Sequence, residues 1–203
     1  MLMRTAWVAA LAAAALQLTP RAPDIFFVPT WQPVVYRMLE LAEVTQDDVV
    51  YDLGSGDGRI VVIAAQKYGA RGVGVELDPK LIEVSRQVAR EAEVSERVTF
   101  VQGDLFQADI SAATVVTLFL SPSVNAELEP KLRKELRPGT RIVSHQFPIG
   151  RWAPLRTVRA PEDKTDLFLW VIPRREQVGG DSQPKRASKG GTGDQEGSFQ
   201  DLF

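Results

Sequence analysis

A set of alternating glycines behind an acidic residue is the part of this sequence best suited to binding a ligand. Residues 51–59 read YDLGSGDGR, in which Gly54, Gly56 and Gly58 occupy every second position after Asp52. Glycine inside a helix or strand costs stability, so alternating glycines mark a backbone that must turn tightly or let another group approach closely. The stretch therefore predicts a loop that holds a ligand.

Two further acidic residues lie where the same ligand could meet them. Glu76 belongs to the apolar stretch GVGVEL at 72–77, and Asp104 ends the stretch RVTFVQGD at 97–104. A carboxylate about 20 residues beyond a glycine loop can accept hydrogen bonds from both hydroxyls of a ribose. Asp104 can accept a hydrogen from an adenine amino group, and Asp52 can bind an amine. Together the three acids predict S-adenosylmethionine, which carries an amine, a ribose and an adenine.

Each of these acids also has a purely structural alternative. Asp52 could cap the loop, Glu76 could be a solvated acid, and Asp104 could be a turn residue. A nicotinamide-dependent oxidoreductase is disfavoured, because a dinucleotide fold uses the spacing G-x-G-x-x-G, which this loop does not match. A non-catalytic module that only binds S-adenosylmethionine stays open, since methyl transfer needs few distinctive side chains.

The middle of the chain predicts an α/β fold that would bring the three acids together. Strands rich in Val, Ile, Leu and Phe alternate with helices, as in a parallel sheet buried on both faces. We expect strands at 48–53, 72–77, 97–104, 113–122 and 140–147, and helices over GRIVVIAAQKYG, from Asp78 or Pro79 onward, and at 124–137. LRTVRA and DLFLWVIP, joined by PEDKT, predict a closing antiparallel hairpin. The predicted fold is thus Rossmann-like, with its ligand at the carboxyl ends of the strands.

Composition and charge exclude several kinds of chemistry. The 203 residues are 44% hydrophobic and 25% charged with a net charge of −2, so nothing here favours nucleic acid as a partner. There is no cysteine, which excludes disulfides, thiolate metal sites and a cysteine nucleophile. The sequence predicts no metal site. The single histidine, His145, is interpreted as a satisfied residue at a strand end and not as a base.

The two ends of the chain differ from its middle. Residues 1–24 contain Arg4 and an apolar run at 6–18, which is shorter than the roughly 20 residues of a membrane-spanning helix. They predict a signal-like or membrane-anchoring segment, with an alanine-rich core helix as the alternative. Residues 25–173 form the predicted folded domain. Residues 174–203, rich in Gly, Ser, Gln and charge, predict a disordered tail.

Several motifs resemble those of class I S-adenosylmethionine-dependent methyltransferases: DLGSGDG, VELDP and GDLF, in this order. FVPT, FLSPSVN and PGTRIVSHQFP extend the resemblance over about residues 26–172. With them the chain is similar to the protein-lysine methyltransferases that modify the mitochondrial adenine nucleotide translocase and the ATP synthase c-subunit, and to their prokaryotic relatives. The resemblance implies a methyltransferase whose cofactor site is formed by Asp52, Gly54, Gly56, Gly58, Glu76, Asp104 and Leu105.

The resemblance also implies where the methyl acceptor binds. Leu120, Ser121 and Pro122 would form one wall beside the methyl group, and the segment 27–31, including Thr30, would form the other. For Thr30 the alternative is a helix cap. An aromatic and proline-lined channel suits the aliphatic stem of a lysine, so the expected acceptor is a lysine side chain of a protein, with a membrane protein as the expected class. A small-molecule acceptor is the alternative, and the sequence does not specify the oligomeric state.

The expected location follows from the cofactor. S-Adenosylmethionine is made in the cytoplasm, so an exported methyltransferase would lack its methyl donor. We therefore expect an uncleaved segment that associates with a membrane through residues 6–18, with the catalytic domain on the cytoplasmic side. Export after cleavage at Ala22 is the alternative.

Overall fold

The structure, a computed structural model, describes residues 28–173, so the predicted segment 1–24 and the predicted tail 174–203 lie outside the described residues. Within residues 28–173, no helix is both long enough and apolar enough to cross a bilayer. In chain order the elements are α1 (Gln32–Leu41), β1 (Val49–Leu53), α2 (Arg59–Tyr68), β2 (Arg71–Glu76), α3 (Pro79–Glu91), β3 (Val98–Gln102), β4 (Val115–Leu118), α4 (Pro122–Glu135), β5 (Arg141–His145), β6 (Arg156–Ala160) and β7 (Thr165–Val171).

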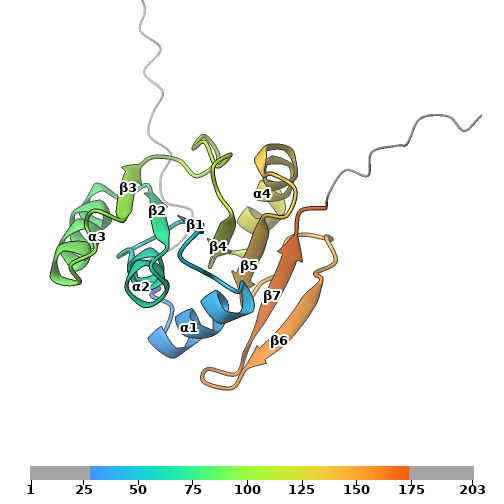
Figure 1. Cartoon of the computed structure of the whole chain (residues 1–203). Helices are drawn as coiled ribbons and strands as arrows, with labels where there is room; N and C mark the ends of the chain where they lie inside the picture. The colour runs from blue at the N-terminus through green and yellow to red at the C-terminus, as the bar shows by residue number, and fades with distance from the viewer. Residues whose placement is uncertain (1–27, 174–203) are drawn as a thin grey trace, which may run out of the picture.

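The strands form one sheet in the order β3-β2-β1-β4-β5-β7-β6 (Figure 1). Strands β1 to β5 pair in parallel, whereas β7 is antiparallel to both β5 and β6. The predicted Rossmann-like α/β fold with a C-terminal antiparallel hairpin is therefore confirmed. β2 lies on one side of β1 and β4 on the other, so the strand order reverses at β1. Ligands of open α/β sheets bind at such a switch point.

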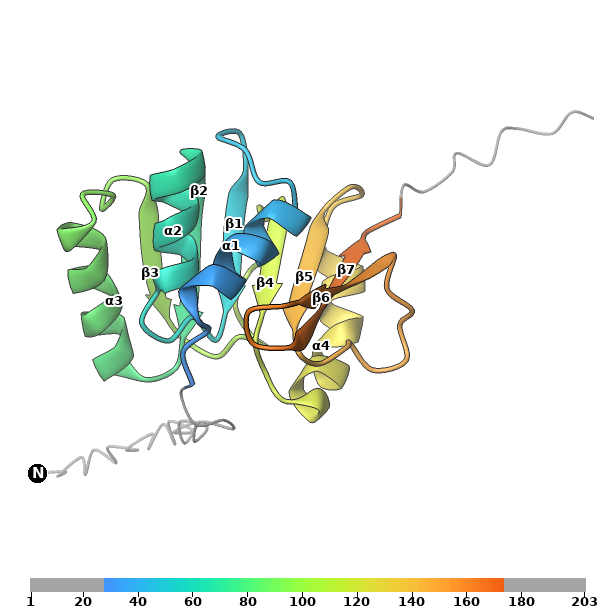
Figure 2. The same ribbon diagram turned by 90° about the horizontal axis from the view of Figure 1, so that it is seen from below.

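Helices cover both faces of this sheet. Helices α1, α2 and α3 lie on one face, and α4 lies on the other (Figure 2). Because alternate strand residues point to opposite faces, Val50 packs in the core under α1 to α3 while Leu53 of the same strand packs on the α4 side. Val115 and Val116 of β4 divide in the same way. Both faces are therefore apolar, as the sequence predicts for strands buried on both sides.

The start of α4 corrects one predicted boundary. The sequence predicts a fourth strand over 113–122 and a helix over 124–137, but β4 is shorter and α4 begins at Pro122. The hydroxyl of Ser121 caps the helix, because its oxygen accepts a hydrogen bond from the backbone N–H of Val124 at 3.3 Å. Proline suits the first helical turn, where no N–H donor is needed, whereas in a strand it would leave a ladder bond unmade. Pro122 therefore belongs to the helix.

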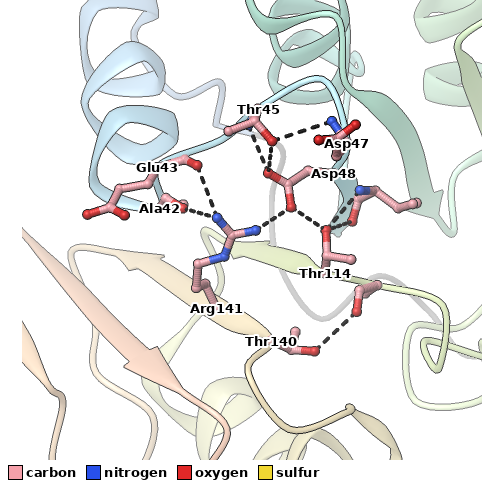
Figure 3. A network of polar contacts seen from close by, with 10 residues as sticks. Ala42, Glu43, Thr45, Asp47, Asp48, Thr114, Thr140 and Arg141 are labelled. Carbon is pink, nitrogen blue, oxygen red and sulfur yellow. Dashed lines mark hydrogen bonds and ion pairs between the residues drawn. The ribbon is translucent and has the colours of Figure 1, made fainter.

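A polar network at the amino ends of the strands, the amino edge of the sheet, connects α1 to the strands (Figure 3). Arg141, the first residue of β5, donates hydrogen bonds to the carbonyl oxygens of Ala42 and Glu43 at 2.7 and 3.0 Å. The same guanidinium forms an ion pair with Asp48, which also accepts a hydrogen bond from the Thr114 hydroxyl at 2.7 Å. Since Ala42 and Glu43 follow the last turn of α1, Arg141 satisfies carbonyl groups that the helix end leaves open.

Candidate active site

The carboxyl ends of β1 to β4 open into a cavity of about 430 Å³, a size typical of cofactor sites. Residues that precede α1 complete its wall. The predicted site residues that line it are Thr30, Asp52, Gly54, Glu76, Asp104, Leu105 and Leu120. The predicted site residues that are not among its lining residues are Gly56, Gly58, Ser121 and Pro122. The three strand-end motifs thus converge on one cavity.

The glycine loop folds back over β2. The backbone N–H groups of Gly54 and Ser55 donate to the carbonyl oxygen of Val75 at 2.9 and 3.0 Å. Gly54 has a φ of 82°, and a Cβ atom there would lie 2.7 Å from the Leu120 side chain. A side chain at this position would therefore be strained and would push into the wall of the cavity.

Gly58 serves packing instead of lining the cavity. Its φ is 77°, and a Cβ atom there would lie 2.5 Å from the Phe100 ring and 2.8 Å from the Cβ of Ser85. Phe100 belongs to β3 and Ser85 to α3. The absence of a side chain at Gly58 thus allows the start of α2 to approach the neighbouring strand and helix closely.

Glu76 is fixed by backbone donors on two sides. One carboxylate oxygen accepts a hydrogen bond from the N–H of Gly56 at 2.9 Å. The other accepts from the N–H groups of Leu77 and Asp78 at 2.7 and 2.9 Å. The oxygen that binds Gly56 retains acceptor capacity toward a ligand, whereas the other already accepts two hydrogen bonds. Glu76 is therefore oriented in the cavity wall and joins the glycine loop to the start of α3.

Asp52 is the most deeply buried acid of the cavity, with 3% of its surface exposed. Its carboxylate accepts a hydrogen bond from the Thr117 hydroxyl at 2.8 Å. Burial raises the pKa of Asp52 to about 7 against the effect of this hydrogen bond, and the negative charges of Asp57 and Glu76 raise the pKa further. A bound cation would relieve this cost, so the site is suited to a positively charged group.

Asp104 lies in the turn after β3, and Leu105 follows it in the cavity wall. One carboxylate oxygen of Asp104 accepts a hydrogen bond from the N–H of Phe106 at 2.8 Å, which is the turn role left open by the sequence. Because Asp104 also lines the cavity, the turn and the ligand-binding interpretations are compatible. The hydrogen bond holds the carboxylate at the cavity wall.

The side of the cavity formed by the end of β4 and by the segment before α1 is apolar. Phe119, Leu120 and Val124 line it from the β4 end and α4, and Val28 and Pro29 line it from the other side. Leu120 is only 5% exposed, so its side chain is packed into this wall. A wall of this kind suits an aliphatic or aromatic group better than a charged one.

The predicted acceptor-side residues divide between the cavity wall and the start of α4. Thr30 is buried and does not cap α1, since Trp31 is the N-cap residue and makes no side-chain capping bond. Ser121 caps α4 and shares a hydrogen bond with the Ser123 hydroxyl at 2.9 Å. Pro122 is the first residue of that helix. The structure thus places Thr30 and Leu120 at the cavity, and Ser121 and Pro122 at the adjoining helix start.

Arg59, which the sequence does not single out, joins the glycine loop to the segment before α1. The Arg59 guanidinium binds the Asp57 carboxylate, with a shortest distance of 2.6 Å, and donates to the carbonyl oxygen of Thr30 at 2.9 Å. All three residues line the cavity. Asp57 and Arg59 lie close together in the sequence DGR of the glycine motif. The contact of Arg59 with Thr30 spans 29 residues and has no local sequence pattern.

Known protein families match this site and fold. The profile of the ANTKMT methyltransferase domain matches residues 52–156, which include the glycine loop, Glu76, Asp104 and the β4 wall. The chain belongs to this methyltransferase family. A protein-lysine N-methyltransferase of Saccharolobus islandicus (strain REY15A) is 46% identical over 74% of this chain and 95% of its own length. A lysine N-methyltransferase of the ATP synthase c-subunit from Mus musculus is 34% identical over 79% of this chain and 62% of its own length.

A solved structure gives the cofactor of this methyltransferase. A protein from Salinibacter ruber, described as an RNA methyltransferase in complex with S-adenosyl-L-homocysteine, is 57% identical with a TM-score of 0.70, covering 77% of this chain and all of that one. The methyltransferase therefore uses S-adenosylmethionine. Its cavity fits that cofactor, because a buried acid with a raised pKa suits the amino group and fixed carboxylates suit hydroxyl and amino hydrogens.

Proposed function

We propose that the methyltransferase transfers the methyl group of S-adenosylmethionine to the ε-amino group of a lysine in a protein. The Saccharolobus islandicus relative supports this acceptor class, since it is named a protein-lysine N-methyltransferase and this chain spans 95% of its length. The observation that carries the proposal is the distribution of charge in the cavity. Acidic groups lie around the predicted cofactor positions, and the acceptor side is apolar.

The charge of the cavity argues against a nucleic acid acceptor. Its acidic lining residues are Asp52, Asp57, Glu76, Asp78 and Asp104. Among the described residues 28–173, the one basic residue that lines it, Arg59, is already paired with Asp57. Phosphate groups are bound by unpaired cationic side chains, so this cavity would repel an RNA backbone. RNA is still the second candidate, because the Salinibacter ruber relative is described as an RNA methyltransferase.

The apolar wall would favour the neutral form of the lysine amine, which is the form that accepts the methyl group. When bound, S-adenosylmethionine supplies a methyl group on a positively charged sulfur. An ordinary lysine amine has a pKa of about 10.4, so its neutral form costs roughly 4–5 kcal/mol at pH 7. Burial among Phe119, Leu120 and Val124 lowers the pKa of an amine, because an apolar surrounding disfavours the charged form. The chain then needs no dedicated base.

The remaining roles proposed for this chain are binding and orientation. Asp52 would hold the cofactor amino group, Glu76 the ribose hydroxyls, and Asp104 with Leu105 the adenine. Gly54 would let the cofactor approach the loop backbone. Thr30 and Leu120 would shape the acceptor channel from its two sides, and Ser121 and Pro122 would act by fixing the start of α4 beside Leu120.

A membrane protein is the acceptor class that we propose within this function. The Mus musculus relative is named for the ATP synthase c-subunit, and this chain spans 62% of that relative's length. We also propose that the catalytic domain works at the cytoplasmic side of a membrane, through the apolar run at 6–18. Cell fractionation with protease protection tests the location. A mature protein that starts after Ala22 in a soluble extracytoplasmic fraction would contradict it.

One experiment separates the candidate functions. The purified enzyme would be incubated with tritiated S-adenosylmethionine and, in parallel, with lysine-containing peptides, total RNA, a small-molecule extract and membrane proteins. We expect label on peptides and membrane proteins, and mass spectrometry should place methyl groups on lysine. Label on RNA or small molecules alone would refute the lysine acceptor. No transfer at all, with S-adenosylmethionine bound, would favour a non-catalytic binding module.

A further inference from the structure

The turn that follows β5 has a backbone conformation that glycine would adopt more easily. Gln146 has a φ of 68°, in the left-handed region that side chains disfavour. The N–H of Phe147 donates to the carbonyl oxygen of His145 at 2.8 Å, which spans Gln146 alone. A three-residue turn with positive φ at its centre is the strained form of the γ-turn. Position 146 nevertheless has a long polar side chain, and this side chain is exposed.

The other left-handed non-glycine residues in the described part of the chain have ordinary structural reasons. Glu43 and Glu93 directly follow the C-cap residues of α1 and α3, where helices commonly end in this conformation. Lys164 lies in the turn between β6 and β7. Gln146 alone follows a parallel strand at the edge of the sheet that carries the active site. Strain retained at such a place is associated with function.

A buried network holds this turn in place. Asn125, which has no exposed surface, donates from its side-chain amide to the Phe147 carbonyl oxygen at 3.0 Å and to the Ser144 hydroxyl at 3.2 Å. The Ser144 hydroxyl donates to the same carbonyl oxygen at 2.6 Å. The N–H of Gln146 donates to the carbonyl oxygen of Asp166 at 2.7 Å. Bonds from α4, β5 and β7 therefore determine one conformation.

The turn is also joined to the acceptor wall. The ring of His145 lies 4.2 Å from the ring of Phe119, measured between centroids, and Phe119 lines the cavity. Val124, another lining residue, directly precedes Asn125 in α4. The imidazole Nε2 of His145 is held by the Asp163 carboxylate and the Thr165 hydroxyl at 3.0 and 2.9 Å. The turn and the apolar wall are thus parts of one packed unit.

We propose that Gln146, whose turn is held by Asn125, is an acceptor-binding residue that contacts the backbone of the polypeptide on either side of the target lysine. This inference rests on the proposed protein-lysine function. A lysine that enters the cavity beside Phe119 brings its flanking backbone over the carboxyl ends of β4 and β5, where Gln146 is exposed. A side-chain amide can both donate to and accept from a peptide backbone, whatever the sequence of the peptide.

The test compares variants that separate the side chain from the strain. Gln146→Gly removes both, and Gln146→Ala removes the side chain but keeps the left-handed conformation. Glu93→Gly is the control, because Glu93 also has a positive φ but lies at the end of α3, away from the active site. The measurements are melting temperature, S-adenosylhomocysteine affinity by calorimetry, and kcat/KM with two acceptor probes. The probes are a panel of lysine-centred peptides of about fifteen residues and N-acetyl-lysine amide, which has no flanking residues.

We expect Gln146→Gly and Gln146→Ala to lower kcat/KM for the peptides roughly tenfold, the effect of one lost hydrogen bond. The value for N-acetyl-lysine amide and the cofactor affinity should not change. Gln146→Gly and Glu93→Gly should each raise the melting temperature by roughly 2–4 °C, while Gln146→Ala should not.

Two different failures are distinguishable. If wild-type enzyme methylates the peptides but the Gln146 variants match it, or if only Gln146→Gly loses activity, the side-chain contact is refuted while the proposed function stands. If wild-type enzyme methylates no lysine probe, the proposed function fails and this inference fails with it.

Discussion

At the scale of single residues, the site depends on one acid, Asp52, that burial has made costly to ionise. Its pKa of about 7 lies near the pH at which the enzyme would work. If it holds the amino group of the cofactor, only its ionised form provides the attraction. The pH dependence of cofactor binding therefore tests its role directly.

We expect S-adenosylhomocysteine affinity to fall as the pH is lowered through 7, approaching tenfold per pH unit well below that value. Affinity should fall again at alkaline pH, where the amino group of the ligand loses its own proton. In Asp52→Asn the loss of affinity at low pH (the lower limb) should vanish, and the loss at high pH (the upper limb) should be smaller. Calorimetry from about pH 5.5 to 9 measures both limbs. An unchanged lower limb in the variant would show that another group titrates.

The raised pKa of Asp52 also makes the free energy of unfolding depend on pH. Stability should fall as pH rises, whereas cofactor affinity should increase. Asp52 has a higher pKa in the folded protein than in the unfolded chain, so the unfolded chain releases the proton first. The contribution of Asp52 to the free energy of unfolding should therefore decrease as pH rises from about 4 to about 7, and stay constant above that. Urea unfolding of wild type and Asp52→Asn across this range would show the two curves converging at acid pH.

Glu76 should matter for both loop and cofactor. Glu76→Ala removes the acceptor of three backbone N–H groups and the predicted bonds to the ribose. We expect S-adenosylhomocysteine affinity to fall at least tenfold, since charge-assisted hydrogen bonds contribute roughly 1.5–3 kcal/mol each. Glu96→Ala, at an exposed turn on the opposite edge of the sheet, is the control. Equal affinities for the two variants in calorimetry would remove Glu76 from the cofactor site.

At the scale of elements, the glycine loop and the segment before α1 act as one unit through Arg59. Arg59→Lys loses the paired contact with Asp57 and the bond to the Thr30 carbonyl oxygen, because lysine has no planar fork. We expect KM for a lysine-centred peptide to rise several-fold, since the wall formed by residues 28–30 is no longer held, with a smaller change in cofactor affinity. Arg71→Lys, exposed at the start of β2, is the control. Equal KM values for both variants would contradict this coupling.

The sequence predicts the elements of this fold well because the central strands are rich in apolar residues. The same property hides strand ends: the apolar and small residues from 113 to 120 give no sign that β4 ends at Leu118. The informative pattern is Ser121 followed by Pro122, a cap and a first helical residue. Contacts between distant segments, such as Arg59 with Thr30, and the left-handed turn at Gln146 arise only from the tertiary structure.

At the scale of the whole molecule, the two edges of the sheet have separate tasks. The carboxyl edge carries the cavity, and the amino edge carries the network of Arg141 and Asp48 (Figure 3). Burial acts to raise the pKa of Asp48, but hydrogen bonds from Thr114 and Thr45 together with the charge of Arg141 outweigh it and hold the pKa below its ordinary value. The network therefore stabilises the fold mainly while Asp48 is ionised.

This separation predicts a variant that loses stability without losing the site. Arg141→Met leaves Asp48 without its cation and the α1 carbonyl groups without their donor, so we expect the free energy of unfolding at pH 7 to fall by roughly 1–3 kcal/mol. Because the folded-state pKa of Asp48 is lowered, its contribution is present above about pH 4 and is lost as pH falls through that lowered value. Urea unfolding curves of wild type and Arg141→Met should thus differ most near neutral pH and approach each other in acid. Calorimetry on the folded variant should give the wild-type affinity for S-adenosylhomocysteine. A weakened affinity would mean that the position of α1 controls the opposite edge of the sheet as well.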